Sequence, residues 1–195
     1  MMDSRTAMIN RLETEIDPEM KALLKEQVKH MDKVIDKAER LCLETVKKNE
    51  RMDSLRDRFT QIGGVGDLTA ISILSSLPEI GTLSDGKLNR LVGIAPEERQ
   101  SGAKEWQRRI WGGRRDVRNA LYMAAVASIK WNAILGGYYR KKRAEGHPHK
   151  WAIVPTMRKL LSLLNRIARD PSFTPRPEPE STKLNANVGR RKKAA

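Results

Sequence analysis

The feature that most constrains this chain of 195 residues is a stretch without glycine that runs from Pro18 to Phe59. Within it, apolar, small and uncharged residues recur at alternating spacings of four and three: Leu24, Val28, Met31, Ile35, Ala38, Cys42, Thr45, Asn49 and Met52. This spacing is a heptad seam, and it predicts a helix of about 40 residues with proline at its start. A single helix of this length cannot cover its own heptad seam. We therefore expect residues 1–60 to form a coiled coil or an antiparallel hairpin that supports a homo-oligomer; packing onto the rest of the chain is the alternative.

The remainder of the chain reads as shorter helices separated by glycine and proline. We predict helices over residues 115–130, 133–144 and 150–168, with one apolar face on the first of them formed by Val117, Leu121, Ala124, Ala125 and Ser128. No alternating strand pattern persists, so the expected fold class is all-α, with a small helical domain over residues 61–170. Residues 171–195 are rich in proline and basic residues, and we expect a disordered basic tail there.

The charge of the chain is unevenly placed, and its placement suggests a partner. The net charge is +14, yet residues 1–60 carry thirteen basic and thirteen acidic residues, whereas residues 97–150 carry thirteen basic and five acidic ones. A basic block inside a foldable segment is typical of proteins that bind nucleic acid, although a solubilising surface is the plain alternative. The sequence has no long apolar run or signal peptide, and Cys42 is its one cysteine. We therefore expect no membrane partner and a cytoplasmic, nucleoid-associated protein.

The segment from Ile62 to Ala70, IGGVGDLTA, resembles the turn of a helix–hairpin–helix. Glycines permit a tight turn and close backbone approach, so the amides of Gly64, Val65 and Gly66 are candidate contacts to a phosphate. A contact of this kind is blind to base sequence and would serve to position DNA. A plain corner between two helices, without a ligand, is the alternative.

Ser101 is the candidate nucleophile, because it lies in a predicted loop among basic residues. A hydroxyl that attacks a phosphodiester needs nearby cations to balance the charge of the transition state. Residues that could supply them, and that are candidate nucleic-acid contacts, are Arg99, Lys104, Arg108 and Arg109. From the residues alone, a serine that forms a turn or caps a helix is the commoner case.

A second group of candidate nucleic-acid contacts stands at the entrance of the predicted helix 115–130. Arg114 and Arg118 are four residues apart and Arg115 lies between them, so the group could hold successive phosphates. The run Arg140–Arg143 is a solvated helix end that could also touch a nucleic-acid backbone. His147 and His149 lack a cysteine or a convincing carboxylate partner, so we assign no metal ligand.

Four stretches, taken in order, resemble the C-terminal domain of the insertion-sequence 116/110/902 transposases. They are IGGVGDLTA, LNRLVGIAPEERQSGAK, IWGGRRDVRNALYMAAVASIKWN and YYRKKRAEGHPHKWAIVPTMRKLLSLLNRIARD, which together span about residues 61–170. The resemblance implies a DNA recombinase that uses a structured guide RNA to choose its DNA. It also implies that Ser101, in the loop after the Ala-Pro pair, is the nucleophile that forms a phosphoserine link.

The resemblance is partial. The family also has an N-terminal nuclease-like domain with four acidic residues that bind metal. Nothing in this sequence supplies it, so we expect Mg²⁺ to bind only in that domain and not in this chain. Gly63 replaces a usual proline and His147 a usual lysine. A non-catalytic remnant or regulator that binds nucleic acid or dimerises remains an alternative, as does a basic RNA-binding protein of another family.

Overall fold

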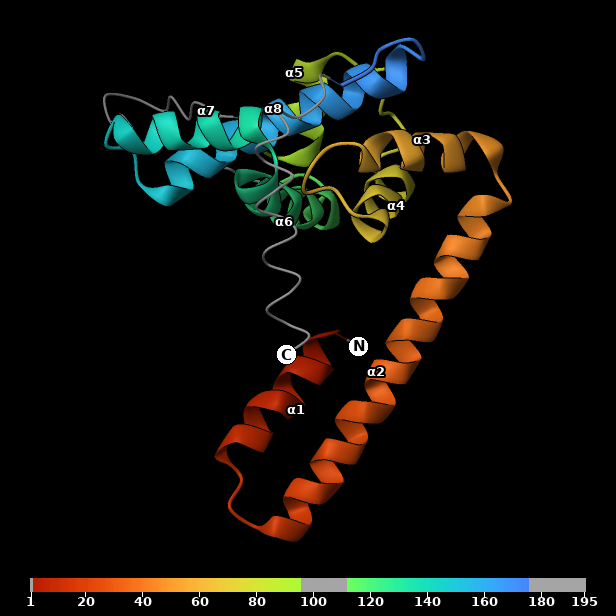
Figure 1. The fold of residues 1–195 in the computed structure, drawn as a ribbon, viewed down its shortest axis with the longest axis vertical. Helices are drawn as coiled ribbons and strands as arrows, with labels where there is room; N and C mark the ends of the chain where they lie inside the picture. Colours follow the sequence, from red (N-terminus) through yellow and green to blue (C-terminus); the bar gives the residue numbers. More distant parts are fainter. Residues whose placement is uncertain (1, 96–111, 176–195) are drawn as a thin grey trace. The chain divides into compact units, whose positions relative to one another are not determined.

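The computed structural model describes residues 2–95 and 112–175, and within these residues the fold is all-helical, as predicted (Figure 1). The chain divides into two compact units, Met1–Asn49 and Glu50–Ala195. None of the described helices is both long and apolar enough to cross a bilayer.

The first unit is a helical hairpin. Helix α1 (Met2–Thr14) runs antiparallel to helix α2 (Pro18–Lys47), to which a short turn joins it (Figure 1). The Asp17 side chain caps α2 by accepting a hydrogen bond from the amide of Glu19 at 3.1 Å, and Pro18 occupies the first turn. Arg5 of α1 forms an ion pair with Asp32 of α2.

The predicted long helix is interrupted, because α2 ends at Lys47 and helix α3 (Glu50–Thr60) begins after a turn at residues 48–49. No glycine or proline marks this break in the sequence. Helix α3 is held in the second unit, because Phe59 is fully buried and the Arg58 guanidinium donates to the carbonyls of Ile167 and Asp170 at 2.7 and 2.8 Å. The chain divides into its two compact units between residues 49 and 50, so α3 belongs to the second unit.

The second unit is built around one helix, α6 (Arg115–Trp131). Four helices pack on it: α4 (Asp67–Ser76), α5 (Asp85–Val92), α7 (Ala133–Ala144) and α8 (His149–Arg169). The helices predicted over 115–130, 133–144 and 150–168 are confirmed to within a residue or two. The predicted apolar face of α6 is confirmed as well, since its five residues are all buried.

Two buried asparagines stabilise the connections between helices of the second unit. Asn132 ends α6 and caps α7, its side-chain oxygen accepting from the amide of Leu135 at 2.9 Å. Asn165, 1% exposed, accepts from the amide of Gly81 at 2.7 Å and donates to the Leu83 carbonyl at 3.1 Å. Because a buried amide must be paired, these bonds hold the α4–α5 connection against α8.

Candidate nucleic-acid interface

The turn between α3 and α4 is fastened to α6. Gly64 has a φ of +100°, and a Cβ at this position would lie 2.4 Å from the amide nitrogen of Ser128. The Ser128 hydroxyl in turn donates to the Gly63 carbonyl at 2.9 Å. Glycine is therefore required at position 64 by backbone conformation and by close helix packing, and this requirement holds without any ligand.

Of the three turn residues predicted as phosphate contacts, Gly66 is the one that is exposed. Val65 is only 5% exposed, and its amide donates to the Ile62 carbonyl at 2.9 Å. Gly66 precedes α4 without a side-chain cap, and a Cβ built there would meet nothing within 4 Å. The first amides of α4 thus open onto an accessible surface, the arrangement that favours an anion.

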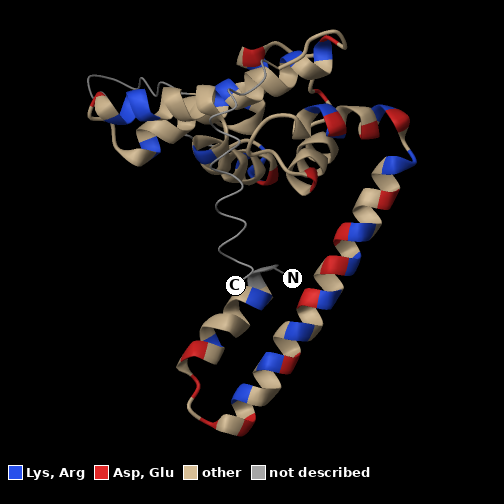
Figure 2. Cartoon of the chain, in the orientation of Figure 1, with Lys and Arg blue, Asp and Glu red and all other residues tan. Residues whose placement is uncertain are grey.

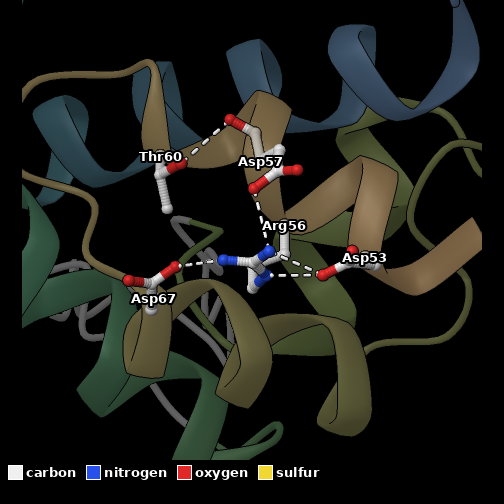
Figure 3. Close-up of polar contacts among 5 residues, drawn as sticks. All are labelled: Asp53, Arg56, Asp57, Thr60 and Asp67. Atoms are coloured by element: carbon white, nitrogen blue, oxygen red, sulfur yellow. Dashed lines mark hydrogen bonds and ion pairs between the residues drawn. The ribbon is translucent and has the colours of Figure 1, made fainter. Parts of the chain in front are cut away.

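An acidic cluster lies beside this turn, and sequence reasoning missed it. Arg56 of α3 contacts three carboxylates: its Nη1 is 2.7 Å from Asp67, and its Nη2 is 2.6 Å from Asp53 and 2.9 Å from Asp57 (Figure 3). Hydrogen bonds to Asp67 and then to Asp53 raise the pKa of the Arg56 guanidinium. Three carboxylates against one guanidinium leave net negative charge, which repels a phosphate approaching from this side. Only the Asp53–Arg56 spacing of three could have suggested the cluster.

Arg114 is engaged within the fold. Its two terminal nitrogens form a bidentate ion pair with Glu79 at 2.5 and 2.6 Å, and Nη1 also donates to the Ser76 carbonyl at 3.0 Å. The Arg114 hydrogen bonds are the main cause that lowers the pKa of Glu79. This side chain therefore joins the start of α6 to the end of α4, across 35 residues of sequence.

Arg118 holds the two ends of one loop together. Its guanidinium donates to the Gly112 carbonyl and lies 3.5 Å from the Val92 carbonyl. A Cβ on Gly93 would lie 2.3 Å from the Gly112 oxygen, and one on Gly113 would lie 2.4 Å from the Gly93 nitrogen. Only glycines allow such a close approach. The loop stem, which we define as residues 91–93 with residues 112–114, is therefore a backbone-to-backbone contact; the amide of Arg114 completes it by donating to the Leu91 carbonyl at 3.1 Å.

The predicted nucleophile and its cations lie outside the described residues. Ser101, Arg99, Lys104, Arg108 and Arg109 all belong to residues 96–111, which leave the described structure at one side of the loop stem and re-enter it at the other. Their assignments stay predictions.

Arg115 is the one of the three helix-entrance arginines that faces solvent without a partner among the described residues. It lies in the first turn of α6, directly after the loop stem. The structure thus brings Arg114, Arg115 and Arg118 to the stem that joins the two ends of residues 96–111, the segment that contains Ser101. Arg114 and Arg118 hold that stem, and Arg115 is exposed beside it.

The two histidines have separate surroundings. His147 Nε2 lies 3.7 Å from a Glu145 carboxylate oxygen. His149 Nδ1 shares a hydrogen bond with the Tyr139 hydroxyl at 2.8 Å. Over residues 2–95 and 112–175 there is no group of three or more histidine, cysteine and acidic side chains that could hold a metal ion.

Part of this chain matches a known protein family. Residues 56–140 match the family described as "Transposase IS116/IS110/IS902 family". The "Insertion element IS110 uncharacterized 43.6 kDa protein" of Streptomyces coelicolor is 28% identical over 131 residues, which are 66% of this chain and 32% of that protein. The "Insertion element IS116 uncharacterized 44.8 kDa protein" of Streptomyces clavuligerus is 27% identical over 135 residues, 68% of this chain and 34% of that protein. The chain spans about a third of the length of these curated relatives.

Proposed function

We propose that this chain, whose residues 56–140 match the IS116/IS110/IS902 family of transposases, belongs to that family, binds DNA and supplies Ser101 as the nucleophile of strand transfer. One observation carries the proposal. The loop stem joins both ends of residues 96–111, a segment that has Ser101 and four of the predicted cations, and places exposed Arg115 at its base. A sugar–phosphate strand held by Arg115 would lie at an end of the segment whose sequence contains Ser101 and the other predicted cations.

The proposed reaction is a transesterification. The Ser101 hydroxyl oxygen attacks the phosphorus of a phosphodiester and forms a phosphoserine bond. The bond from phosphorus to one deoxyribose oxygen breaks, and the serine proton passes to that leaving oxygen directly or through solvent. One phosphate ester bond replaces another, so no nucleotide hydrolysis is needed. Arg99, Lys104, Arg108, Arg109 and Arg115 are the residues proposed to stabilise the charge on the phosphoryl oxygens.

The Mg²⁺ expected from the family resemblance has no binding residues that we can assign in the described part of the chain. The steps above therefore use only this chain's own residues. A structured guide RNA as a further partner is likewise a proposal, as is action on DNA at the nucleoid; the basic surface of the second unit supports both.

A suicide DNA substrate, nicked so that the leaving strand diffuses away, tests the serine. The chain is incubated with element-end DNA, alone and together with the part of a matched relative that lies outside the aligned region. We expect a covalent protein–DNA adduct that disappears in Ser101→Ala. Ser84→Ala is the matched control, because Ser84 is exposed and its side chain caps no helix. Equal adduct in wild type and Ser101→Ala would overturn the assignment.

We also propose that α2 pairs with α2 of a second copy. The seam is covered by α1 only in its first half: Leu24 is buried and Val28, Met31 and Ile35 are partly buried, whereas Ala38, Cys42 and Thr45 are exposed. At 1.5 Å per residue, α1 reaches along about 20 Å and α2 along about 45 Å, so α1 is too short to cover the seam. An uncovered heptad seam is the surface that a coiled-coil partner fits.

Sedimentation of the full chain tests this pairing. We expect a dimer or larger species that Cys42→Lys dissociates, because a lysine ammonium would be buried in the seam. Glu44→Lys is the control, since Glu44 is exposed and lies off the seam. A parallel pair also brings the two Cys42 thiols together, so mild oxidation should link the chains through this one cysteine. A monomer at every concentration would contradict the proposal.

A further inference from the structure

Three helices of the second unit bring aromatic side chains together at the surface. The rings of Tyr122 of α6 and Tyr139 of α7 both contact the imidazole of His149 of α8, and these three helices pack on one another. His149 Nδ1 lies 2.8 Å from the Tyr139 hydroxyl, and His149 Nε2 lies 3.5 Å from the Tyr122 hydroxyl. The imidazole therefore connects the two phenols, and its ring orientation is set by them.

This cluster is not a part of the core. The Tyr122 side chain is 41% exposed, His149 is exposed and Tyr139 is half-buried. The imidazole meets the tyrosine rings at 87° and 68°, so neither tyrosine is stacked face to face with it. Met123 and Val126, within one turn of Tyr122, are 62% and 38% exposed and extend the apolar surface. Rings held by helices yet open to water offer flat apolar area at little entropic cost.

The segments that carry the cluster are rich in basic residues. Residues 115–151 contain eight Lys or Arg and two Asp or Glu. The basic run Arg140–Arg143 ends α7 a few residues before His149, and Figure 2 shows blue segments at that end of α7. On α6, Tyr122 shares one exposed stripe with Arg115 and Asn119, at spacings of three and four residues. The stripe leads from the loop stem to the aromatic cluster.

We propose that Tyr122, Tyr139 and His149 form a stacking site for an unpaired base of a nucleic-acid single strand. Every base has an aromatic face, but in a duplex both faces are covered by neighbouring bases. A site made of rings therefore takes a base that is out of the helix, while flanking Lys and Arg hold the phosphates on either side. The hydroxyls and imidazole nitrogens add hydrogen-bonding groups at the edge of the base. The inference rests on the proposed function in one respect, that the chain binds nucleic acid.

Fluorescence anisotropy with short labelled oligothymidine, oligouridine and a DNA duplex tests the site in the full chain. We expect Tyr122→Ala to weaken single-strand binding by roughly fivefold to a hundredfold and to change duplex binding by no more than about twofold. Tyr122→Phe keeps the ring and should keep the single-strand affinity. Ile134→Ala is the matched control, because Ile134 is an exposed apolar residue without a ring, at the start of α7. The two single-strand probes show whether the site prefers DNA or RNA.

Each outcome decides between the proposals. Irradiating complexes with iodouracil-substituted oligonucleotides should attach the base to Tyr122 or Tyr139, and mass spectrometry of the peptides identifies the residue. If Tyr122→Ala, folded as judged by its melting temperature, retains full single-strand affinity, or the base attaches elsewhere, the stacking site is wrong while duplex binding still stands. If neither duplex nor single strand binds in a salt-sensitive way, the proposed function itself fails.

Discussion

At the scale of single residues, two residues of the same type that are close in the sequence can have different structural roles. Gly64 and Gly66 read alike in the sequence, yet only Gly64 has a positive φ and a helix backbone against its α-carbon. Arg114 and Arg115 are adjacent, yet one is bound to Glu79 and the other faces solvent. Sequence spacing identified these residues as a group, and it could not separate those that hold the fold from those that remain free to bind.

Gly64→Ala should lower the free energy of unfolding by at least about 2 kcal/mol, because it combines left-handed backbone strain with a clash against the Ser128 backbone. Gly66→Ala should stay within about 0.5 kcal/mol, since Gly66 has a φ of −93° and open space at its Cβ position. Chemical denaturation of both variants measures the difference. Equal stability of the two would contradict the packing role of Gly64.

At the scale of elements, the second unit is joined by polar contacts at helix ends. Arg114 connects the start of α6 to the end of α4, Arg58 connects α3 to the end of α8, and Asn165 connects α8 to the α4–α5 link. These contacts leave the exposed faces of α6 and α7 free. The helices therefore serve as a rigid support for the loop stem and for the aromatic cluster.

The Glu79–Arg114 pair predicts a pH dependence of stability. Hydrogen bonds from Arg114 lower the pKa of Glu79, so the folded state holds the carboxylate ionised more strongly than the unfolded state does. This contribution is present above the unfolded pKa of about 4.5 and is lost as the pH falls through the lower folded value. Glu79→Gln should therefore be less stable than wild type at pH 7 and approach it in acid.

Thermal melts of the two proteins between neutral pH and about pH 3 measure this convergence. Glu50→Gln is the control, because Glu50 is exposed on α3 and no ion pair of the described structure includes it. A stability difference between Glu79→Gln and wild type that stays constant over the whole range would contradict the ion-pair assignment.

At the scale of the whole molecule, charge separates the two units. Residues 1–49 of the first unit carry ten basic and ten acidic residues, whereas residues 97–150 of the second unit carry a net positive charge. Within the second unit, the three aspartates around Arg56 form a local acidic site beside the α3–α4 turn (Figures 2 and 3). We therefore expect nucleic acid to approach the second unit from the side of the loop stem and α7, where the cations gather, and not from the side of Arg56.

Binding of duplex DNA should weaken steeply with salt, because each phosphate contact releases a counterion. Arg115→Ala should weaken binding and reduce the slope of log affinity against log salt by about 1, with little change in melting temperature. Arg114→Ala should instead lower the melting temperature, since it breaks the contacts to Glu79 and Ser76. An unchanged slope in Arg115→Ala would exclude a phosphate contact by this residue.

Local patterns were sufficient for much of the fold. The all-helical class, the bounds of α6, α7 and α8 and the buried face of α6 follow from periodicity and from glycine or proline at the ends, because helix formation depends on neighbours three and four residues apart. The family resemblance of residues 61–170 also depends on local sequence, because it rests on short motifs that occur in the family's order. The family match covers residues 56–140.

Only the tertiary structure decided which side chains meet. The break between α2 and α3, the ion pair of Arg114 with a residue 35 positions away, the contact of Gly93 with Gly113 and the Tyr122–His149–Tyr139 cluster all depend on distant segments. Packing selects such partners by shape and charge in three dimensions, and the spacing of residues along one helix carries no information about them.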